Sequence, residues 1–301
     1  MHRFLVFLVV AVAMNSAVCG AAEKKSPAPS GRAAIADRTK SPYLGAIAID
    51  ALNGKVLFED NPDAVGYPAS VLKLMDLYLV LDRIQKGQLK LDDMVNVTAE
   101  AAKTGGSQVY LKEKETFTVD EMLYALMVQS ANDAAVALAI HIGGSKDGFV
   151  EMMNAKAKDL GMKNTTFHSV HGLPPSAGQE PDVTTPRDLA TLGRALILQH
   201  PEALKYTATK SHTFRPDKDE KTGKMNLVNH DHLLGTLAGC DGLKTGYYKA
   251  AGYSTVITAS RNGQRIITVV MGSGPEIDFG RLRDKKAAEI TNKAFAQLGA
   301  K

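Results

Sequence analysis

The hydrophobic positions of the chain change their period along its length, and the changes predict strands near both ends with helices between them. Apolar runs at 44–50 and 55–58 flank Asn53-Gly54, a dipeptide typical of a β-hairpin turn. The middle of the chain shows helical spacing instead, which predicts helices over 70–87, 98–103, 118–130, 132–142, 146–160 and 185–198. Short strands and loops are expected over 206–225. Three further strands at 240–248, 251–260 and 264–271, and a closing helix at 276–298, complete the chain.

Strands at both ends around a helical insert predict an α+β fold. In this fold the N-terminal hairpin completes one five-stranded antiparallel sheet, and helices flank its faces. The helical insert forms a second lobe, and a cleft between the lobes is where we expect a functional site.

The helix expected near Ser70 carries too many apolar residues for one amphipathic stripe, so we expect it to be buried nearly all round. Ser70 and Lys73 lie within it, and a spacing of three puts both side chains on one face. A hydroxyl becomes a useful nucleophile only when a base removes its proton, and burial lowers the pKa of an amine enough for it to be that base. The pair is therefore a candidate for nucleophilic chemistry.

The N-terminus has the features of a secretory signal peptide over residues 1–22. A short basic start precedes an apolar run at 4–14, which is shorter than the roughly 20 residues of a membrane-spanning helix. Small residues follow, and cleavage is expected near Ala21 or Ala22. Lipidation of Cys19 stays open. Residues 23–40 are predicted to be a solvated linker, and residues 41–301 the folded domain.

Composition narrows the possible functions. The chain is 45% hydrophobic and 23% charged with a formal net charge of +4, and it has no block of Lys and Arg, which argues against nucleic-acid binding. Without the signal peptide, Cys240 is a lone thiol, expected to be a small buried hydrophobe. His230 and His232 flank Asp231, but no further ligand group is evident, so neither a metal nor another cofactor is expected.

Two more motifs follow the Ser70 pair: Ser130-Ala131-Asn132 and Lys244-Thr245-Gly246. Each alone has an ordinary explanation, as helix caps, a solvated charge or a β-bulge. Together and in this order they resemble the penicillin-recognising serine enzymes, and specifically the D-alanyl-D-alanine carboxypeptidase family of low-molecular-mass penicillin-binding proteins. Further matches to this family are Tyr67-Pro68-Ala69, Leu160-Gly161-Met162, Thr185-Pro186-Arg187-Asp188 and Asp241-Gly242-Leu243.

The resemblance implies a role for each motif residue. Ser70 is the expected acylated nucleophile, Lys73 its base, and Ser130 the relay that protonates the leaving D-alanine. Asn132 is expected to bind the substrate peptide and to orient Lys73.

The third motif is expected to bind the end of the substrate. Lys244 and Thr245 hold the terminal carboxylate, and Gly246 leaves room for a substrate backbone along the strand. The backbone N–H groups of Ser70 and Tyr247 form the oxyanion hole. Relatives add an arginine after the last strand, and Arg281 is the candidate here.

These roles imply a serine-type DD-carboxypeptidase of peptidoglycan stem peptides that penicillins inhibit covalently. A DD-endopeptidase that cuts cross-links, a class A β-lactamase and a catalytically silent peptidoglycan-binding protein remain alternatives. The β-lactamase needs a Glu-x-x-x-Asn motif, whereas Glu180 is followed by Pro181-Asp182-Val183-Thr184.

Two departures from the family pattern affect these expectations. Ala131 stands where relatives usually carry Gly, which we expect to narrow the cleft slightly. The sequence ends just past the closing helix, without the β-rich domain and amphipathic anchor of the best-known relatives. We therefore expect an exported protein, periplasmic or extracellular, that is soluble after signal cleavage.

Overall fold

A computed structural model describes residues 42–218, 223–274 and 278–299. The chain divides into two units, residues 1–30 and 31–301, and every described residue belongs to the second. The predicted signal peptide at 1–22, with Cys19, and the linker at 23–40 lie outside the described residues. Within the described ranges, the search for a helix long and apolar enough to cross a bilayer finds none.

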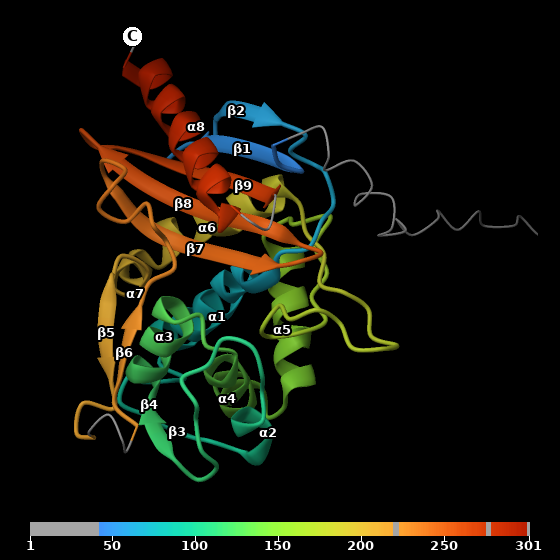
Figure 1. Ribbon diagram of the computed structural model, residues 1–301, viewed down its shortest axis with the longest axis vertical. Coiled ribbons are helices and arrows are strands. Elements are labelled where there is room, and N and C mark those ends of the chain that lie inside the picture. Colours follow the sequence, from blue (N-terminus) through green and yellow to red (C-terminus); the bar gives the residue numbers. More distant parts are fainter. Residues whose placement is uncertain (1–41, 219–222, 275–277, 300–301) are drawn as a thin grey trace, which may run out of the picture. The chain divides into compact units, whose positions relative to one another are not determined.

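Five strands form one antiparallel sheet in the order β2-β1-β9-β8-β7 (Figure 1). The strands are β1 (Gly45–Asp50), β2 (Val56–Asp60), β7 (Cys240–Tyr248), β8 (Gly252–Arg261) and β9 (Gln264–Ser273). The N-terminal hairpin joins the C-terminal strands where β1 pairs with β9, with Ala46 opposite Val270. The predicted five-stranded antiparallel sheet is confirmed.

The two Asn-Gly turns differ in length. Asn262 and Gly263 adopt positive φ angles of 49° and 77° and connect β8 to β9 directly, as a two-residue hairpin requires. The first hairpin has a longer loop between Asp50 and Val56. In this loop the Asp50 carboxylate accepts the Leu52 N–H at 2.8 Å, so the turn begins before Asn53.

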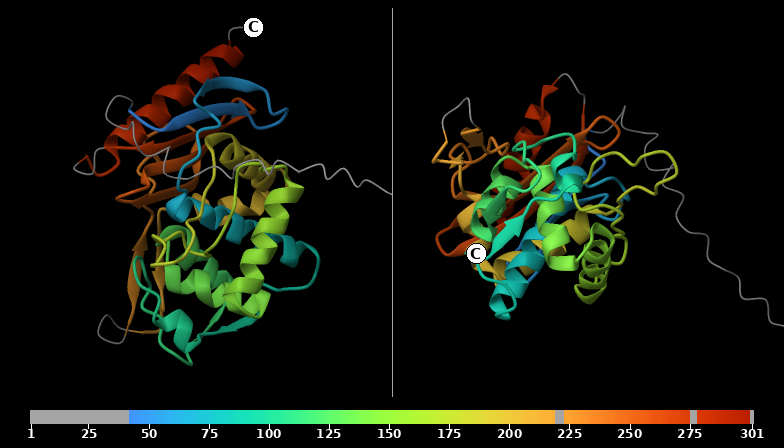
Figure 2. Two further views of the ribbon diagram at one scale, coloured as in Figure 1. Left: turned by 90° about the vertical axis from the view of Figure 1, so that its right-hand side faces the viewer. Right: turned by 90° about the horizontal axis from the view of Figure 1, so that it is seen from below.

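Helices cover both faces of the sheet and form the second lobe (Figures 1 and 2). They are α1 (Lys73–Gln85), α2 (Ala99–Ala102), α3 (Val119–Val128), α4 (Asn132–Gly143), α5 (Lys146–Asp159), α6 (Pro186–Gln199), α7 (Leu204–Thr207) and α8 (Arg281–Gly299), with single 3-10 turns at Ala69–Leu72 and Pro201–Ala203. Thr98, Thr118 and Thr185, the first residues of three predicted helices, are N-caps whose hydroxyls each accept a backbone N–H three residues on.

Alternate residues of the sheet feed two separate cores. On one face Ala46, Ile257 and Val270 pack against Ala287 and Ile290 of α8. On the other face the neighbouring positions, among them Ile47, Val256 and Val269, join the larger core that contains α6 and the helical lobe. This alternation is the period of two that the sequence pattern predicts for strands.

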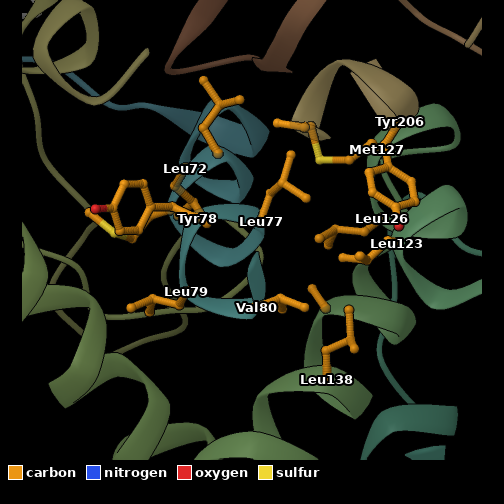
Figure 3. Packing of buried hydrophobic residues seen from close by; sticks show 14 of the residues in the cluster. Leu72, Leu77, Tyr78, Leu79, Val80, Leu123, Leu126, Met127, Leu138 and Tyr206 are labelled. Atoms are coloured by element: carbon orange, nitrogen blue, oxygen red, sulfur yellow. The ribbon is translucent and has the colours of Figure 1, made fainter. Parts of the chain in front are cut away.

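Helix α1 lies at the centre of the helical lobe, surrounded by α3, α4, α5 and α6. Figure 3 shows its side chains packed among neighbours from α3, α4 and α7. Every residue from Lys73 to Leu81 is buried, which confirms the prediction of a helix buried nearly all round. A charged side chain inside such a helix is costly unless the surroundings provide partners for it.

Among the described residues, two smaller sheets lie outside the five-stranded sheet. A small sheet of β3 (Met94–Asn96) and β4 (Thr116–Thr118) was not predicted, because three residues are too few to display a period of two. The short strands expected near 206–225 are β5 (Ser211–Phe214) and β6 (Met225–Val228).

The closing helix begins at Arg281 and not at 276. Phe279 and Gly280 have positive φ angles of 52° and 82°, which an α-helix does not allow, and the Asp278 carboxylate accepts the Leu282 N–H at 2.9 Å. Residues 275–277 lie outside the described part of the chain.

Candidate active site

Ser70 lies in a tight turn immediately before α1, and not in the α-helix itself. The turn is the 3-10 segment Ala69–Leu72, and Lys73 is the first residue of α1. In a 3-10 turn, side chains three residues apart lie directly above one another. The turn therefore brings the two side chains together, and Lys73 Nζ lies 2.9 Å from Ser70 Oγ.

Lys73 Nζ has two further partners, both of them oxygen acceptors. Asn132 Oδ1 lies at 2.7 Å and the backbone carbonyl of His171 at 2.9 Å. A neutral amine has two N–H donors and one lone pair. In this neutral form the two acceptors can take both N–H groups, and the lone pair then faces Ser70 Oγ, whereas the ammonium form donates to all three oxygens. The geometry is that of a base positioned on its nucleophile.

The electrostatics of Lys73 favour the neutral amine. Complete burial lowers its pKa to about 7, while Asp76, Asp133 and Asp182 act in the opposite direction. A substantial share of the molecules then carries the free base at neutral pH. The apolar surroundings of α1 thus provide the condition that Ser70 activation requires.

The second motif connects α3 to α4 and faces the same point. Asn132 opens α4 and is held by three bonds, because its N–H donates to the Ser107 carbonyl at 2.8 Å and its Nδ2 to the Gly105 carbonyl at 2.8 Å, while Oδ1 meets Lys73. Ser130 has a positive φ of 59°, and its buried Oγ has no hydrogen-bond partner among the described residues. A ligand in the adjoining cavity can supply that partner.

The third motif lies on β7, against the Ser70 turn. Lys244 and Thr245 are both buried, and burial followed by the charges of Lys73 and Arg283 lowers the Lys244 pKa well below its usual value. A carboxylate arriving beside Lys244 offsets that repulsion. A Cβ at Gly246 would lie 2.8 Å from the Pro68 carbonyl oxygen and 3.0 Å from the Ser70 nitrogen. Gly246 is thus required for the nucleophile turn itself to approach the strand.

A cavity of about 480 Å³ joins the three motifs. Its polar wall comes from Ser70, Ser130 and Thr245, and an aromatic wall from Tyr247 and Tyr253, whose rings stack with centroids 4.1 Å apart. Lys73, Asn132 and Lys244 lie behind this surface, where they contact the lining residues. The expected site residues are thus brought together, with one exception.

The exception is Arg281, which is exposed at the start of α8 and does not line the cavity. Arg283 lines it instead, is only 4% exposed, and donates from Nε to Asp284 Oδ1 at 2.7 Å. The helix begins five residues later than predicted, at Arg281 itself. Arg281 therefore lies exposed at the first position of α8, and Arg283 lies buried two residues further on. The sequence offers two arginines in one turn and no signal to choose between them.

Three histidines at the site were not predicted as site residues from the sequence. His171 contributes its backbone carbonyl to Lys73, and a carbonyl leaves no trace in a residue pattern. His230 lines the cavity, and burial lowers its pKa to about 4, so its imidazole is neutral at neutral pH. His232 Nδ1 lies 3.1 Å from Asp284 Oδ2. In the described part of the chain, no three His, Cys, Asp or Glu side chains gather closely enough to hold a metal ion.

Residues 36–274 match the family model described as D-alanyl-D-alanine carboxypeptidase, peptidase S11. The chain belongs to this family. D-alanyl-D-alanine carboxypeptidase DacF of Bacillus subtilis is 36% identical over 252 residues, which are 84% of this chain and 62% of that protein. DacC of Escherichia coli is 38% identical over 256 residues, 83% of this chain and 60% of that protein. The chain thus spans about three fifths of the length of these curated carboxypeptidases.

Solved structures share the fold. Penicillin-binding protein D2 of Listeria monocytogenes, in an ampicillin-bound form, matches with a TM-score of 0.73 and 32% identity over 84% of this chain and 97% of that one. A mutant form of the DD-transpeptidase of Streptomyces K15 matches with a TM-score of 0.74 and 27% identity over 85% and 98%. Both are similar to this carboxypeptidase-family chain over nearly their whole length.

A class A β-lactamase uses a carboxylate to activate its deacylating water, and the described part of this site shows none in the cavity lining. Glu180 is exposed on the loop before α6, and no Asp or Glu is among the described residues that line the cavity. Groups near Ser70 that can exchange a proton include Lys73, which contacts it, and Ser130, His230 and His232, which line the same cavity.

Proposed function

We propose that the protein is a serine-type DD-carboxypeptidase, which removes the terminal D-alanine from peptidoglycan stem peptides through an acyl-enzyme on Ser70. The observation that carries the proposal is the contact of Lys73 Nζ with Ser70 Oγ at 2.9 Å, with both amine N–H groups engaged elsewhere. This arrangement leaves the lone pair of Lys73 free for one task, which is to accept the Ser70 proton.

Acylation follows from this geometry. As Ser70 Oγ attacks the carbonyl of the terminal peptide bond, its proton passes to Lys73. The oxyanion forms beside the backbone N–H groups of Ser70 and Tyr247, and loss of one such donor typically costs about 100- to 1000-fold in rate. Ser130 then relays the proton from Lys73 to the amine of the departing D-alanine, which makes it a neutral leaving group.

The chemistry of a carboxypeptidase also requires a site for the free carboxylate of its substrate. Thr245 and Arg283 line the cavity on the side of β7 and α8, with Lys244 behind them. We propose these three residues as the carboxylate site, with Arg283 in the place first given to Arg281. A hydrogen-bonded guanidinium discriminates strongly for a carboxylate over a neutral amide.

Deacylation needs a water activated by the same groups that served acylation. With a stem peptide, the released D-alanine diffuses away and opens space for this water, while the shortened peptide stays bound to Ser70 until the water hydrolyses the ester. With a penicillin, the amine that leaves the opened β-lactam ring stays covalently attached and fills that space. We therefore propose that penicillins acylate Ser70 and form a long-lived adduct.

The proposal extends to the parts of the chain outside the described residues. We propose that residues 1–22 direct export and are removed, that residues 41–301 form the catalytic domain, and that the enzyme acts in the periplasm or outside the cell, where peptidoglycan lies. N-terminal sequencing of the mature protein tests the cleavage near Ala21 or Ala22.

A stem pentapeptide tests the proposed reaction directly. Mass spectrometry should show the loss of one alanine with wild-type protein and no loss with Ser70→Ala. A DD-endopeptidase would instead release monomers from cross-linked muropeptide dimers while leaving the pentapeptide intact. If folded wild-type protein changes neither substrate, the proposed function is wrong.

A further inference from the structure

Asp76 is a buried carboxyl group with no role in the mechanism above. It lies on α1, three residues after Lys73, and positions three apart on a helix lie on one face with Cβ atoms about 5–6 Å apart. Its side chain is 1% exposed, and neither carboxyl oxygen has a hydrogen-bond partner among the described residues. Leaving a buried polar group unpaired destabilises the fold unless the group serves another purpose.

The other two carboxyl groups near Lys73 are explained by structure. Asp133 accepts the backbone N–H groups of Val109 at 3.2 Å and Leu111 at 3.0 Å, and so fixes the loop before β4. Asp182 accepts the backbone N–H groups of His168 at 2.7 Å and Ser169 at 2.8 Å. Both carboxylates thus fix a loop beside the site, whereas the Asp76 carboxyl binds no backbone N–H among the described residues.

We propose that Asp76 is a positioning residue for acylation, which acts through its charge to set the proton affinity of Lys73. This inference rests on the proposed function, in which Lys73 is the base. A negative charge near Lys73 stabilises the ammonium form, which arises when Ser70 gives up its proton. The other two carboxylates are shielded by the N–H dipoles that bind them. Asp76 has no such donor among the described residues, so its charge, when the group is ionised, acts on Lys73 in an apolar surrounding.

Other charged groups face the pair and enter the same balance. They are Asp133 from α4, His171 and Asp182 from the segment before α6, His230 from the segment before β7, and Lys244 from β7. Burial raises the Asp76 pKa well above its usual value, and the neighbouring Lys73 lowers it. The two groups therefore titrate as a coupled pair, so that removal of the carboxyl should change the pH profile of acylation and not only its rate.

Two substitutions separate charge from packing. Asp76→Asn keeps the shape and removes the charge. Asp76→Thr also removes the charge, and its hydroxyl can bond to the helix carbonyl four residues before it, so that no unpaired polar group remains. Asp82→Asn is the matched control, because Asp82 is on the same helix but pairs with Lys86 at 2.7 Å near the surface.

The experiment measures the second-order rate of acylation by a fluorescent penicillin between about pH 5 and pH 9. We expect the acidic limb of the profile to move down by about one pH unit in both Asp76 variants, with a lower rate at the plateau, while Asp82→Asn follows wild type. Asp76→Thr should in addition raise the melting temperature, because the unpaired carboxyl is gone.

Each outcome decides a separate point. Coincident profiles for wild type and two folded Asp76 variants overturn the inference, and so does a limb that moves to higher pH. If wild-type protein is not acylated at any pH, the proposed function fails before the role of Asp76 is reached. If Asp76→Asn does not fold, Asp76→Thr carries the same test.

Discussion

Among single residues, Lys73 is the one on which the proposed acylation depends most, because its amine must be neutral when substrate binds. Lys73 has a pKa lowered to about 7 by burial, and only the unprotonated form accepts the Ser70 proton. Its conjugate acid is the inactive form, so acylation should be lost as the pH falls through this pKa. At neutral pH only part of the molecules therefore carry Lys73 as the reactive free amine.

We therefore expect the rate of penicillin acylation to fall about tenfold for each pH unit below about pH 6, and to level off above about pH 8. Stopped-flow measurement with a fluorescent penicillin gives this profile. A rate that stays flat down to about pH 5, with the protein still folded, would contradict the role of Lys73.

The two arginines of α8 offer a paired test of the carboxylate site. Arg283 lines the cavity and Arg281 does not. Arg283→Ala should reduce kcat/KM for a peptide with a free terminal carboxylate by about 100-fold, corresponding to the 2–5 kcal/mol of a lost buried charge contact. Arg281→Ala is the control and should stay close to wild type. Equal losses in both variants would show that the distinction is wrong.

The residues of the site divide by how they act. The proposed nucleophile, base, proton relay and carboxylate-binding lysine act through side chains in ordered motifs, and these four residues, Ser70, Lys73, Ser130 and Lys244, were predicted from the sequence. The His171 carbonyl acts through the backbone, and Arg283 depends on where a helix starts, so neither has a signal in the residue pattern. Asp76 was not selected because an acidic residue in a helix is ordinary until its burial is known.

At the scale of elements, the site requires β7 to pass very close to the nucleophile turn. Gly246→Ala would place a methyl group within 3.0 Å of three backbone atoms, so the strand or the turn must move. A displacement of about 1 Å costs about 100-fold in a positioned reaction, and we expect at least this loss in acylation rate. Gly274→Ala, where the added Cβ meets nothing within 4 Å, is the control. An unimpaired Gly246→Ala enzyme would refute this reason for the glycine.

Elements were predictable where their chemistry is local. The Thr caps determine where α2, α3 and α6 begin, and the Asn262-Gly263 turn determines where β8 ends and β9 begins. The sequence predicts these boundaries to within a residue. Ser70 was expected inside an α-helix, because a 3-10 turn has nearly the same apolar spacing as the helix that follows it. The start of α8 was missed because it depends on positive φ at Phe279, which a non-glycine residue rarely adopts.

At the scale of the whole molecule, residues far apart in the chain make one site. Lys73 Nζ contacts Asn132 across 59 positions and His171 across 98, and the sheet that carries Lys244 includes the N-terminal hairpin. The order of strands and helices was enough to predict the five-stranded sheet. The pairing of β1 with β9 joins the N-terminal hairpin to the C-terminal strands, and β7, at one edge of this sheet, packs against the Ser70 turn.

We propose that Ser70 is a nucleophile activated by Lys73. Intact-protein mass spectrometry after exposure to benzylpenicillin is the most direct test of this proposal. We predict that wild-type protein gains the mass of one penicillin, that the adduct persists, and that the modified peptide contains Ser70. Ser70→Ala should gain nothing while keeping the thermal stability of wild type. A folded wild-type protein that stays unmodified, or an adduct that forms equally in Ser70→Ala, would contradict the account.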